Sequence, residues 1–152
     1  MKKNIKGQSI FEVVLALGLI TLVIVAIVAV AGISIKNSSF SRNSTLATRN
    51  SEATLEWLRG QRDEDWDDFY VRAVSLKWCL PNLTWEGSKI GECEDSDYIE
   101  DTSLKREVDF VVDPLDSTNI ETSVKIYWID AGGYHEVNSC LLYTSPSPRD
   151  RG

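Results

Sequence analysis

The apolar positions divide the chain into a continuous apolar stretch, an amphipathic stretch and a region of alternating residues. From Val13 to Ile35 nearly every residue is apolar, and only glycines and hydroxyl residues interrupt the run. At 1.5 Å per residue these roughly 23 residues form about 34 Å of helix, enough to cross the hydrocarbon core of a bilayer. The sequence therefore predicts a membrane-spanning helix.

The next stretch is polar, but apolar and small residues still recur three or four positions apart, as on one face of a helix. No proline interrupts residues 36–60. We therefore expect one helix to continue out of the membrane and to cover a small sheet with its apolar stripe. The aromatic residues Trp66, Phe69 and Tyr70 repeat this spacing and predict a further helical turn at the domain edge. The stripe itself comprises Phe40, Leu46, Ala47, Asn50, Ala53, Thr54, Trp57 and Leu58.

Strand patterns dominate the second half of the chain. Residues 78–102 contain turn-forming residues and an acidic run, and predict mainly loop with one short strand. Apolar positions then alternate with charged ones in residues 104–112 and again in 123–129. Residues 130–133 are typical of a tight hairpin, and 134–137 begin a return strand. The expected fold class is α+β: a long N-terminal helix, half transmembrane and half amphipathic, packed on a small antiparallel β-meander.

The charge distribution sets the direction of the membrane helix. The 152 residues include 16 basic and 23 acidic ones, and Lys2, Lys3 and Lys6 all precede the apolar stretch. The positive-inside rule keeps this end in the cytoplasm and exports the rest, which is acidic and not suited to direct nucleic-acid binding. A cleaved secretory signal also starts with basic residues, but its apolar core is shorter and a small-residue cleavage site follows it.

Glu12 is the one charged residue at the start of the apolar stretch. A carboxylate in mid-bilayer costs up to about 2.5–3.5 kcal/mol and by default marks a functional site with a partner. At the membrane interface the same group would only favour the positive end of the helix dipole. Glu12 taken alone leaves both interpretations open.

Residues 6–13 read KGQSIFEV, and this segment resembles the type III signal of type IV prepilins and pseudopilins. In that family a membrane aspartyl peptidase cuts after the glycine that ends a short basic leader, and the new N-terminus is methylated. The resemblance covers Met1 to about Lys36, although Gln8 and Ser9 replace the more common Phe-Thr pair. It implies cleavage between Gly7 and Gln8, and N-methylation of Gln8. It further implies that Glu12 pairs with the N-terminal amine of a neighbouring subunit and so sets assembly register.

The resemblance implies a structural subunit, a minor pilin or pseudopilin of a type IV pilus, type II secretion or DNA-uptake filament, with a pilin-like fold. It implies no enzyme activity and no cofactor. The partners would be a prepilin peptidase, other pilin or pseudopilin subunits, the assembly platform and the inner membrane. The chain would be a single-pass cytoplasmic membrane protein with its N-terminus inside, and later part of an extracellular or periplasmic filament. The alternative is a signal-anchored extracellular domain that binds a ligand and does not polymerise.

The cysteines fit an exported domain. Cys79 and Cys93 bracket a short loop, and closing a loop of this size by a disulfide is worth about 3 kcal/mol in the chain-entropy model. The alternative is two free, buried thiols. A third residue, Cys140, leaves the count odd.

Other candidate sites have weaker patterns. His135 has no nucleophile at a recognisable spacing, so a solvated histidine is favoured over a catalytic one. The acidic run that includes Glu92, Glu94, Asp95 and Asp97 could bind Ca²⁺ but lacks the spacing of an EF-hand loop, so a solvated acidic loop is favoured and no metal is expected. Asn82-Leu83-Thr84 matches a glycosylation acceptor only as a short pattern. The tryptophans could bind carbohydrate, but Trp57, Trp66 and Trp128 lie on apolar faces typical of core residues.

The C-terminal stretch departs from the strand pattern. Residues 140–150 are identical, in one reading frame, to a translated transposase sequencing adapter. We therefore expect Cys140 to be non-native, the native chain to continue differently after about Ser139, and Cys140 to Gly152 to pack poorly. The predicted division is a leader of residues 1–7, a transmembrane and filament-core helix of 8–36, an extracytoplasmic pilin-like domain of 37–139 and a non-native tail of 140–152.

Overall fold

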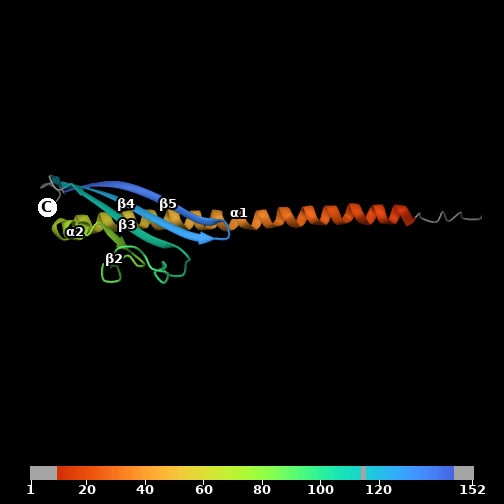
Figure 1. Cartoon of the computed structure of the whole chain (residues 1–152). Helices are drawn as coiled ribbons and strands as arrows, with labels where there is room; N and C mark the ends of the chain where they lie inside the picture. Colours follow the sequence, from red (N-terminus) through yellow and green to blue (C-terminus); the bar gives the residue numbers. More distant parts are fainter. Residues whose placement is uncertain (1–9, 114–115, 146–152) are drawn as a thin grey trace, which may run out of the picture. The chain divides into compact units, whose positions relative to one another are not determined.

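The structure is a computed structural model that describes residues 10–113 and 116–145. It confirms the α+β class: a long N-terminal helix packs on a five-stranded antiparallel sheet in a pilin-like arrangement (Figure 1). The chain divides after Phe40 into two compact units. The elements are α1 (Ile10–Glu64), α2 (Trp66–Ala73), β1 (Lys77–Cys79), β2 (Lys89–Ile90), β3 (Lys105–Asp113), β4 (Asp116–Asp130) and β5 (Gly133–Thr144).

Helix α1 has different surfaces in the two units, although proline interrupts neither part. In residues 10–35 every side chain is exposed, and the Thr21 hydroxyl is satisfied within the helix by donating to the carbonyl of Gly18 at 2.9 Å. After Ser41 the helix buries Ala47, Ser51, Thr54 and Leu58 against the sheet.

The expected stripe on α1 is wrong at three positions. Phe40 is exposed. Ala53 is exposed, whereas Ser51, which the prediction omitted, is fully buried. Burial follows steps of four, three and four residues from Ala47, and these steps keep one face of a 3.6-residue helix on the sheet. The small Ser51 side chain lies on that face and Ala53 lies off it.

Helix α2 confirms the helical turn predicted from the aromatic spacing. Asp65 caps its N-terminus, because Oδ1 accepts the backbone N–H groups of Asp67 and Asp68, each at 3.0 Å. The cap satisfies two donors that a helix start otherwise leaves unpaired. It places Phe69 in the core, where its ring meets Phe110 edge-on with 5.8 Å between ring centroids.

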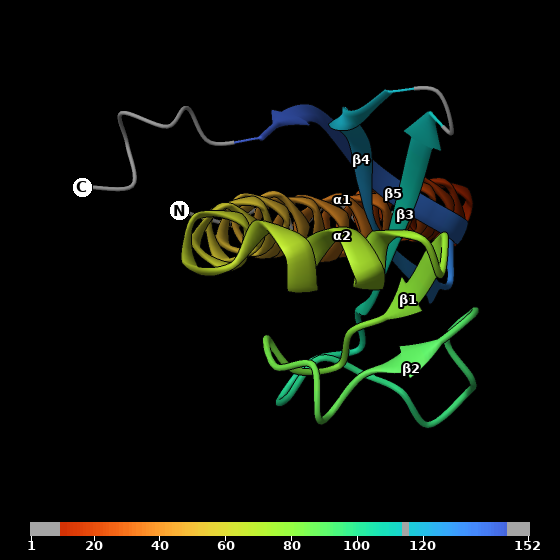
Figure 2. The same ribbon diagram turned by 90° about the vertical axis from the view of Figure 1, so that its left-hand side faces the viewer.

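The sheet has the order β2-β1-β3-β4-β5, and every neighbouring pair is antiparallel. Strands β3, β4 and β5 form the predicted meander, with one face on the helix side (Figures 1 and 2). The region expected to hold one short strand holds two, β1 and β2, which extend the sheet beyond β3. Three-residue and two-residue strands are too short to show a period-two pattern, which explains why the sequence did not reveal both.

Strand β4 begins seven residues before the predicted strand, at Asp116. Its polar first half hides the alternation, but Ile120 and Thr122 are fully buried on the core face. This longer β4 gives the C-terminal segment a partner, and the expectation of poor packing is wrong for Cys140 to Thr144. These residues continue β5 opposite β4, and Tyr143 is buried opposite Ile120. Residues 146–152 lie outside the described part of the chain.

The core lies between the sheet and the helices. Its centre is aromatic: Tyr143 meets Phe69 at 5.6 Å between ring centroids, and the Tyr143 hydroxyl donates to the carbonyl of Leu55 at 2.9 Å. The buried apolar residues are Ala47, Leu58, Phe69, Ala73, Trp78, Cys79, Leu80, Ile99, Leu104, Val108, Phe110, Ile120, Val124, Ile126, Trp128 and Tyr143.

Candidate functional site

The N-terminal segment carries the predicted processing site and the membrane helix. Gly7 and Gln8 lie outside the described residues, whereas Glu12 lies in the first turn of α1 with an exposed side chain. Within the described part of the chain, α1 is the one helix long and apolar enough to cross a membrane. The continuous exposed apolar surface of residues 13–35 requires lipid or other protein to cover it.

A disulfide joins Cys79 and Cys93, the predicted pair, with 5.0 Å between their Cα atoms. Cys79 lies in β1 between two neighbours, opposite Lys89 of β2 and opposite Glu107 of β3. After β2 the chain turns at Gly91, whose φ of 108° favours glycine, and its N–H donates to the carbonyl of Lys77 at 2.9 Å. This turn brings Cys93 back over β1.

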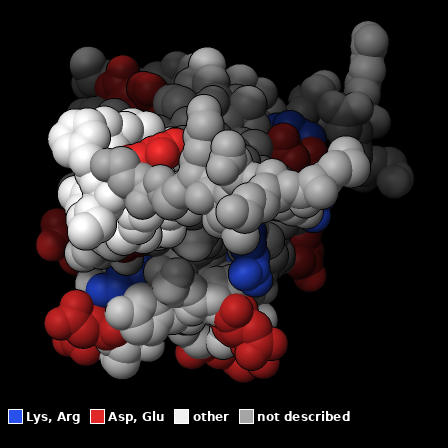
Figure 3. Space-filling view, turned by 90° about the vertical axis from the view of Figure 1, so that its right-hand side faces the viewer, with Lys and Arg blue, Asp and Glu red and all other residues white. Residues whose placement is uncertain are grey.

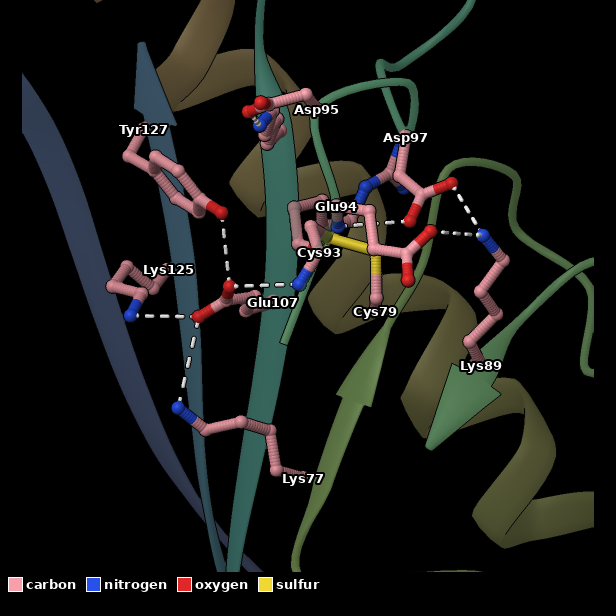
Figure 4. The surroundings of a disulfide bond; sticks show 12 residues. Lys77, Cys79, Lys89, Cys93, Glu94, Asp95, Asp97, Glu107, Lys125 and Tyr127 are labelled. Atoms are coloured by element: carbon pink, nitrogen blue, oxygen red, sulfur yellow. Dashed lines mark hydrogen bonds and ion pairs between the residues drawn. A yellow bond between two sulfur atoms is a disulfide. The ribbon is translucent and has the colours of Figure 1, made fainter. Parts of the chain in front are cut away.

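Glu107 lies directly beside the disulfide on the sheet face away from the helices, and only 3 % of its side chain is exposed. Its Oε1 accepts the backbone N–H of Cys93 at 3.1 Å and the Tyr127 hydroxyl at 2.9 Å (Figure 4). Its Oε2 lies 2.7 Å from Lys125 Nζ and 3.7 Å from Lys77 Nζ. The sequence placed Glu107 on the polar face of its strand but gave no signal that this carboxylate would be buried.

The surroundings of Glu107 favour its ionised form. Burial by itself would raise the pKa of this carboxyl, but hydrogen bonds from Lys125, from the Cys93 N–H and from Tyr127 outweigh it and hold the pKa below its usual value. Burial and the same contact with Glu107 raise the pKa of Tyr127, so its hydroxyl stays protonated as a donor. The group is therefore a carboxylate held by two ammonium groups and two hydrogen-bond donors.

Most of the acidic run is solvated, as expected: the Glu92 and Glu94 side chains are 81 and 78 % exposed and Asp95 is fully exposed, whereas Asp97 is buried. Lys89 Nζ lies 2.7 Å from an oxygen of Asp97 and 3.7 Å from one of Glu94 (Figure 4). Asp97 also accepts the N–H of Glu94 at 3.0 Å, and the Lys89 hydrogen bond is the main cause of its lowered pKa. Lys105 Nζ reaches Asp95 at 3.3 Å. Among the described residues no three His, Cys, Asp or Glu side chains converge as a metal site would require.

Acidic and basic side chains also lie close together on the face seen in Figure 3. The pairs around the disulfide loop show the same mixture, since Lys77 contacts Glu92 at 3.6 Å and Asp109 at 3.4 Å. Surface pairs of this kind contribute about 0–1 kcal/mol each, so they position the loop more than they stabilise the fold.

Tryptophans join the loop after β1 to the helices. The Trp85 ring lies 4.8 Å from that of Trp57 and 5.2 Å from that of Trp78, measured between centroids. Its Nε1 donates to Gln61 Oε1 at 2.6 Å, and the Arg72 guanidinium stacks 4.9 Å from its ring. Trp57 and Trp66 are partly buried against the core and Trp128 is buried, as predicted. The cluster thus packs the loop after β1 against both helices.

Arg106 is buried on the core face of β3, between the buried Leu104 and Val108. Its Nη1 donates to the Thr54 hydroxyl at 3.0 Å, which in turn donates to the carbonyl of Asn50 at 2.6 Å. Among the described residues no carboxylate pairs with this guanidinium, and burial lowers its pKa to about 10. The guanidinium remains charged at neutral pH, so Thr54 is the neutral acceptor of a buried cation.

His135 is not the solvated histidine that was expected. Its ring lies 5.3 Å from that of Trp128, and its Nε2 lies 3.0 Å from Asp130 Oδ1. Asp130 Oδ1 also accepts the N–H of Gly132 at 2.7 Å, so these residues close the β4–β5 hairpin. These contacts give His135 a structural role in the hairpin.

An open groove of about 510 Å³ lies between α1 and the loop before β3. Leu46, Ile99 and Leu104 line it together with Arg42, Glu100 and other polar residues of the loop. The sequence did not indicate this groove, because its lining comes from two segments far apart along the chain.

The chain matches no protein-family model, no curated protein and no solved structure.

Proposed function

We propose that this chain is a structural subunit, a minor pilin or pseudopilin, of a type IV pilus, type II secretion or DNA-uptake filament. The observation that carries the proposal is helix α1. One helix bears an exposed apolar surface over residues 13–35 and, after Ser41, covers an antiparallel sheet. Such a helix can lie first in a bilayer and then in the apolar interior of a filament, with the sheet domain outside.

The presence of Glu12 favours a subunit that assembles into a filament over a helix that only anchors the domain. In the apolar interior of a filament an unpaired carboxylate is strongly penalised, so a register that leaves Glu12 without a cation is disfavoured. A prepilin peptidase cut after Gly7 would supply that cation as the N-terminal amine of a neighbouring subunit. The partners in this proposal are the peptidase, other pilin subunits, the assembly platform and the inner membrane.

The proposal is tested by substituting Glu12 with valine and measuring the subunit in sheared filaments. Insertion and processing should persist, because valine is easier to place in the membrane than a carboxylate. Incorporation should fall, since the neighbour's amine is left as an uncompensated buried charge, a loss of about 3–5 kcal/mol.

Thr21→Val is the matched control for this experiment. It removes a polar group from the same helix, but one whose hydrogen bond is made within that helix. It should assemble like the unmodified chain. Wild-type incorporation of Glu12→Val would refute the register role.

A second candidate is an anchored extracellular domain that binds a ligand without polymerising. The observation that favours it is the groove of about 510 Å³, which has the size of a small-molecule site. In this case Glu12 only favours the helix dipole, and its loss should cost less than about 1 kcal/mol and leave no assembly defect. The Glu12→Val experiment therefore separates the two candidates.

A further inference from the structure

Glu107 and Cys79 are directly opposite each other in neighbouring strands. Opposite residues in an antiparallel pair share one face with Cβ atoms about 4.5–5.5 Å apart, so the two side chains start as neighbours on the same face of the sheet. The same carboxylate accepts the backbone N–H of Cys93 at 3.1 Å. Glu107 thus holds the main chain of the residue that Cys79 must reach (Figure 4).

Three of the four contacts to the Glu107 carboxylate come from the sheet and do not require the disulfide. Lys125 of β4 lies directly opposite Glu107. Lys77 of β1 and Tyr127 of β4 each lie two residues along the strand from the position opposite Glu107. Their side chains reach the carboxylate from the sheet itself, at 2.7, 3.7 and 2.9 Å. A folded, reduced chain would therefore already present an ionised acceptor, oriented towards the loop.

From this geometry we infer that Glu107 is a positioning residue for disulfide closure, which holds Cys93 over Cys79 before the sulfur–sulfur bond forms. The loop is short and turns at Gly91, whose N–H bonds to Lys77. In the segment between Gly91 and Asp97, the backbone N–H of Cys93 connects the loop to the sheet by donating to the Glu107 carboxylate. The role concerns closure of the loop and does not depend on whether the chain polymerises.

The closure step is a thiol–disulfide exchange with a small-molecule disulfide such as oxidised glutathione. One cysteine thiolate attacks glutathione disulfide, forms a mixed disulfide and releases one glutathione thiolate. The second cysteine thiolate then attacks the protein sulfur of the mixed disulfide, forms the Cys79–Cys93 bond and releases the second glutathione. Two protein thiols are oxidised, one glutathione disulfide is reduced to two thiols, and the two cysteine protons pass to them. Positioning by Glu107 acts on the second, intramolecular attack.

The test uses the full chain in detergent with Cys140→Ser in every variant, because Cys140 is an exposed third thiol. Reduced protein is equilibrated with mixtures of reduced and oxidised glutathione, quenched, alkylated and analysed by mass. This gives the effective concentration of the two thiols and, from time courses, separate rates for mixed-disulfide formation and for ring closure.

Glu107→Ala should lower the effective concentration by roughly tenfold to a hundredfold, the range expected for a hydrogen bond to a charged group. Ring closure should slow while formation of the mixed disulfide changes little. Glu107→Gln keeps an acceptor oxygen but not the charge, so its loss should be smaller.

Asp109→Ala is the matched control. Asp109 lies two residues along the same strand face and is paired with Lys77 at 3.4 Å, so its loss alters the local charge without removing the Cys93 acceptor. It should leave ring closure unchanged. Tryptophan fluorescence of each reduced variant reports whether its sheet is folded.

Three results would overturn the inference. Folded Glu107 variants could close the ring at the wild-type rate, or Asp109→Ala could slow closure as much as Glu107→Ala does. Failure of both Glu107 variants to fold when reduced would show that this carboxylate is needed for the sheet itself, not for positioning Cys93.

Discussion

At the scale of single residues, strand β3 buries two charges that are satisfied in different ways. Glu107 has two ammonium groups and two hydrogen-bond donors around it, so its charge is compensated on the sheet. Arg106 precedes Glu107 and lies on the opposite face of the sheet, where its guanidinium donates to the Thr54 hydroxyl. Alternation along one strand thus puts the anion beside the disulfide and the cation in the core.

The lowered pKa of Glu107 predicts a pH dependence of stability. A carboxyl with a folded-state pKa below its unfolded value stabilises the fold above the unfolded pKa, and this contribution is lost as the pH falls through the folded pKa. The free energy of unfolding should therefore decline below about pH 4.5, the ordinary value for glutamate. Glu107→Gln should be less stable at neutral pH and show a smaller decline in acid. Urea titrations of both chains between pH 7 and pH 3 measure this, and parallel curves would contradict it.

At the scale of elements, the helix–sheet contact depends on a polar group in the middle of an apolar interface. Thr54 of α1 and Arg106 of β3 are 52 residues apart in sequence and are joined by one hydrogen bond of 3.0 Å. A buried donor that loses its acceptor costs about 1–3 kcal/mol. Replacing both partners by apolar side chains of similar shape removes that cost.

Thr54→Val is accordingly predicted to reduce the free energy of unfolding by about 1–3 kcal/mol, because it leaves the guanidinium donor unpaired. Adding Arg106→Met should recover most of the loss. Thr45→Val is the control, since Thr45 is exposed on the same helix and makes the same kind of bond, to the carbonyl of Ser41. Its effect should stay within about 0.5 kcal/mol. Additive losses in the double variant would exclude the proposed coupling.

The elements also show how far sequence reasoning reached. The helix as far as Gly60, α2, the meander and the turn at residues 130–133 follow from periodicity and turn chemistry, which act locally. Strands β1 and β2 are too short to carry a period, and the polar start of β4 hides its buried Ile120. The burial of Glu107 and the groove by Leu46 depend on segments that meet only in the folded chain.

The C-terminal part of β5 leads to a prediction about the native sequence. Positions 141 and 143 lie opposite the buried Thr122 and Ile120, so whatever follows Ser139 in the native chain should be a strand with apolar side chains at both positions. A genomic read through the junction, made without transposase adapters, should show such a segment in place of the present codons. A read that retains the present codons would refute the adapter origin.

At the scale of the whole molecule, two requirements meet in one chain. The apolar surface of residues 13–35 must be covered by lipid or protein, whereas the sheet domain has its own core and disulfide. A filament subunit satisfies both requirements, since its helix passes from the bilayer to the filament interior. Cleavage after Gly7 would leave the helix in the mature chain, unlike removal of a secretory signal.

Gly7→Ala is therefore predicted to block processing and to leave the chain inserted in the membrane, because the cut and the anchor are separate features. Immunoblots of membrane fractions should show only the longer precursor. Processing of this variant at the wild-type rate would mean that the cut lies elsewhere.

The most direct measurement is the mass of the N-terminal peptide of the mature protein, isolated from cells that express a prepilin peptidase. We predict a mature chain that begins at Gln8, carries a methylated amine and keeps Glu12 as its fifth residue. A mature protein that still begins at Met1, or one that has lost the apolar helix, would contradict it.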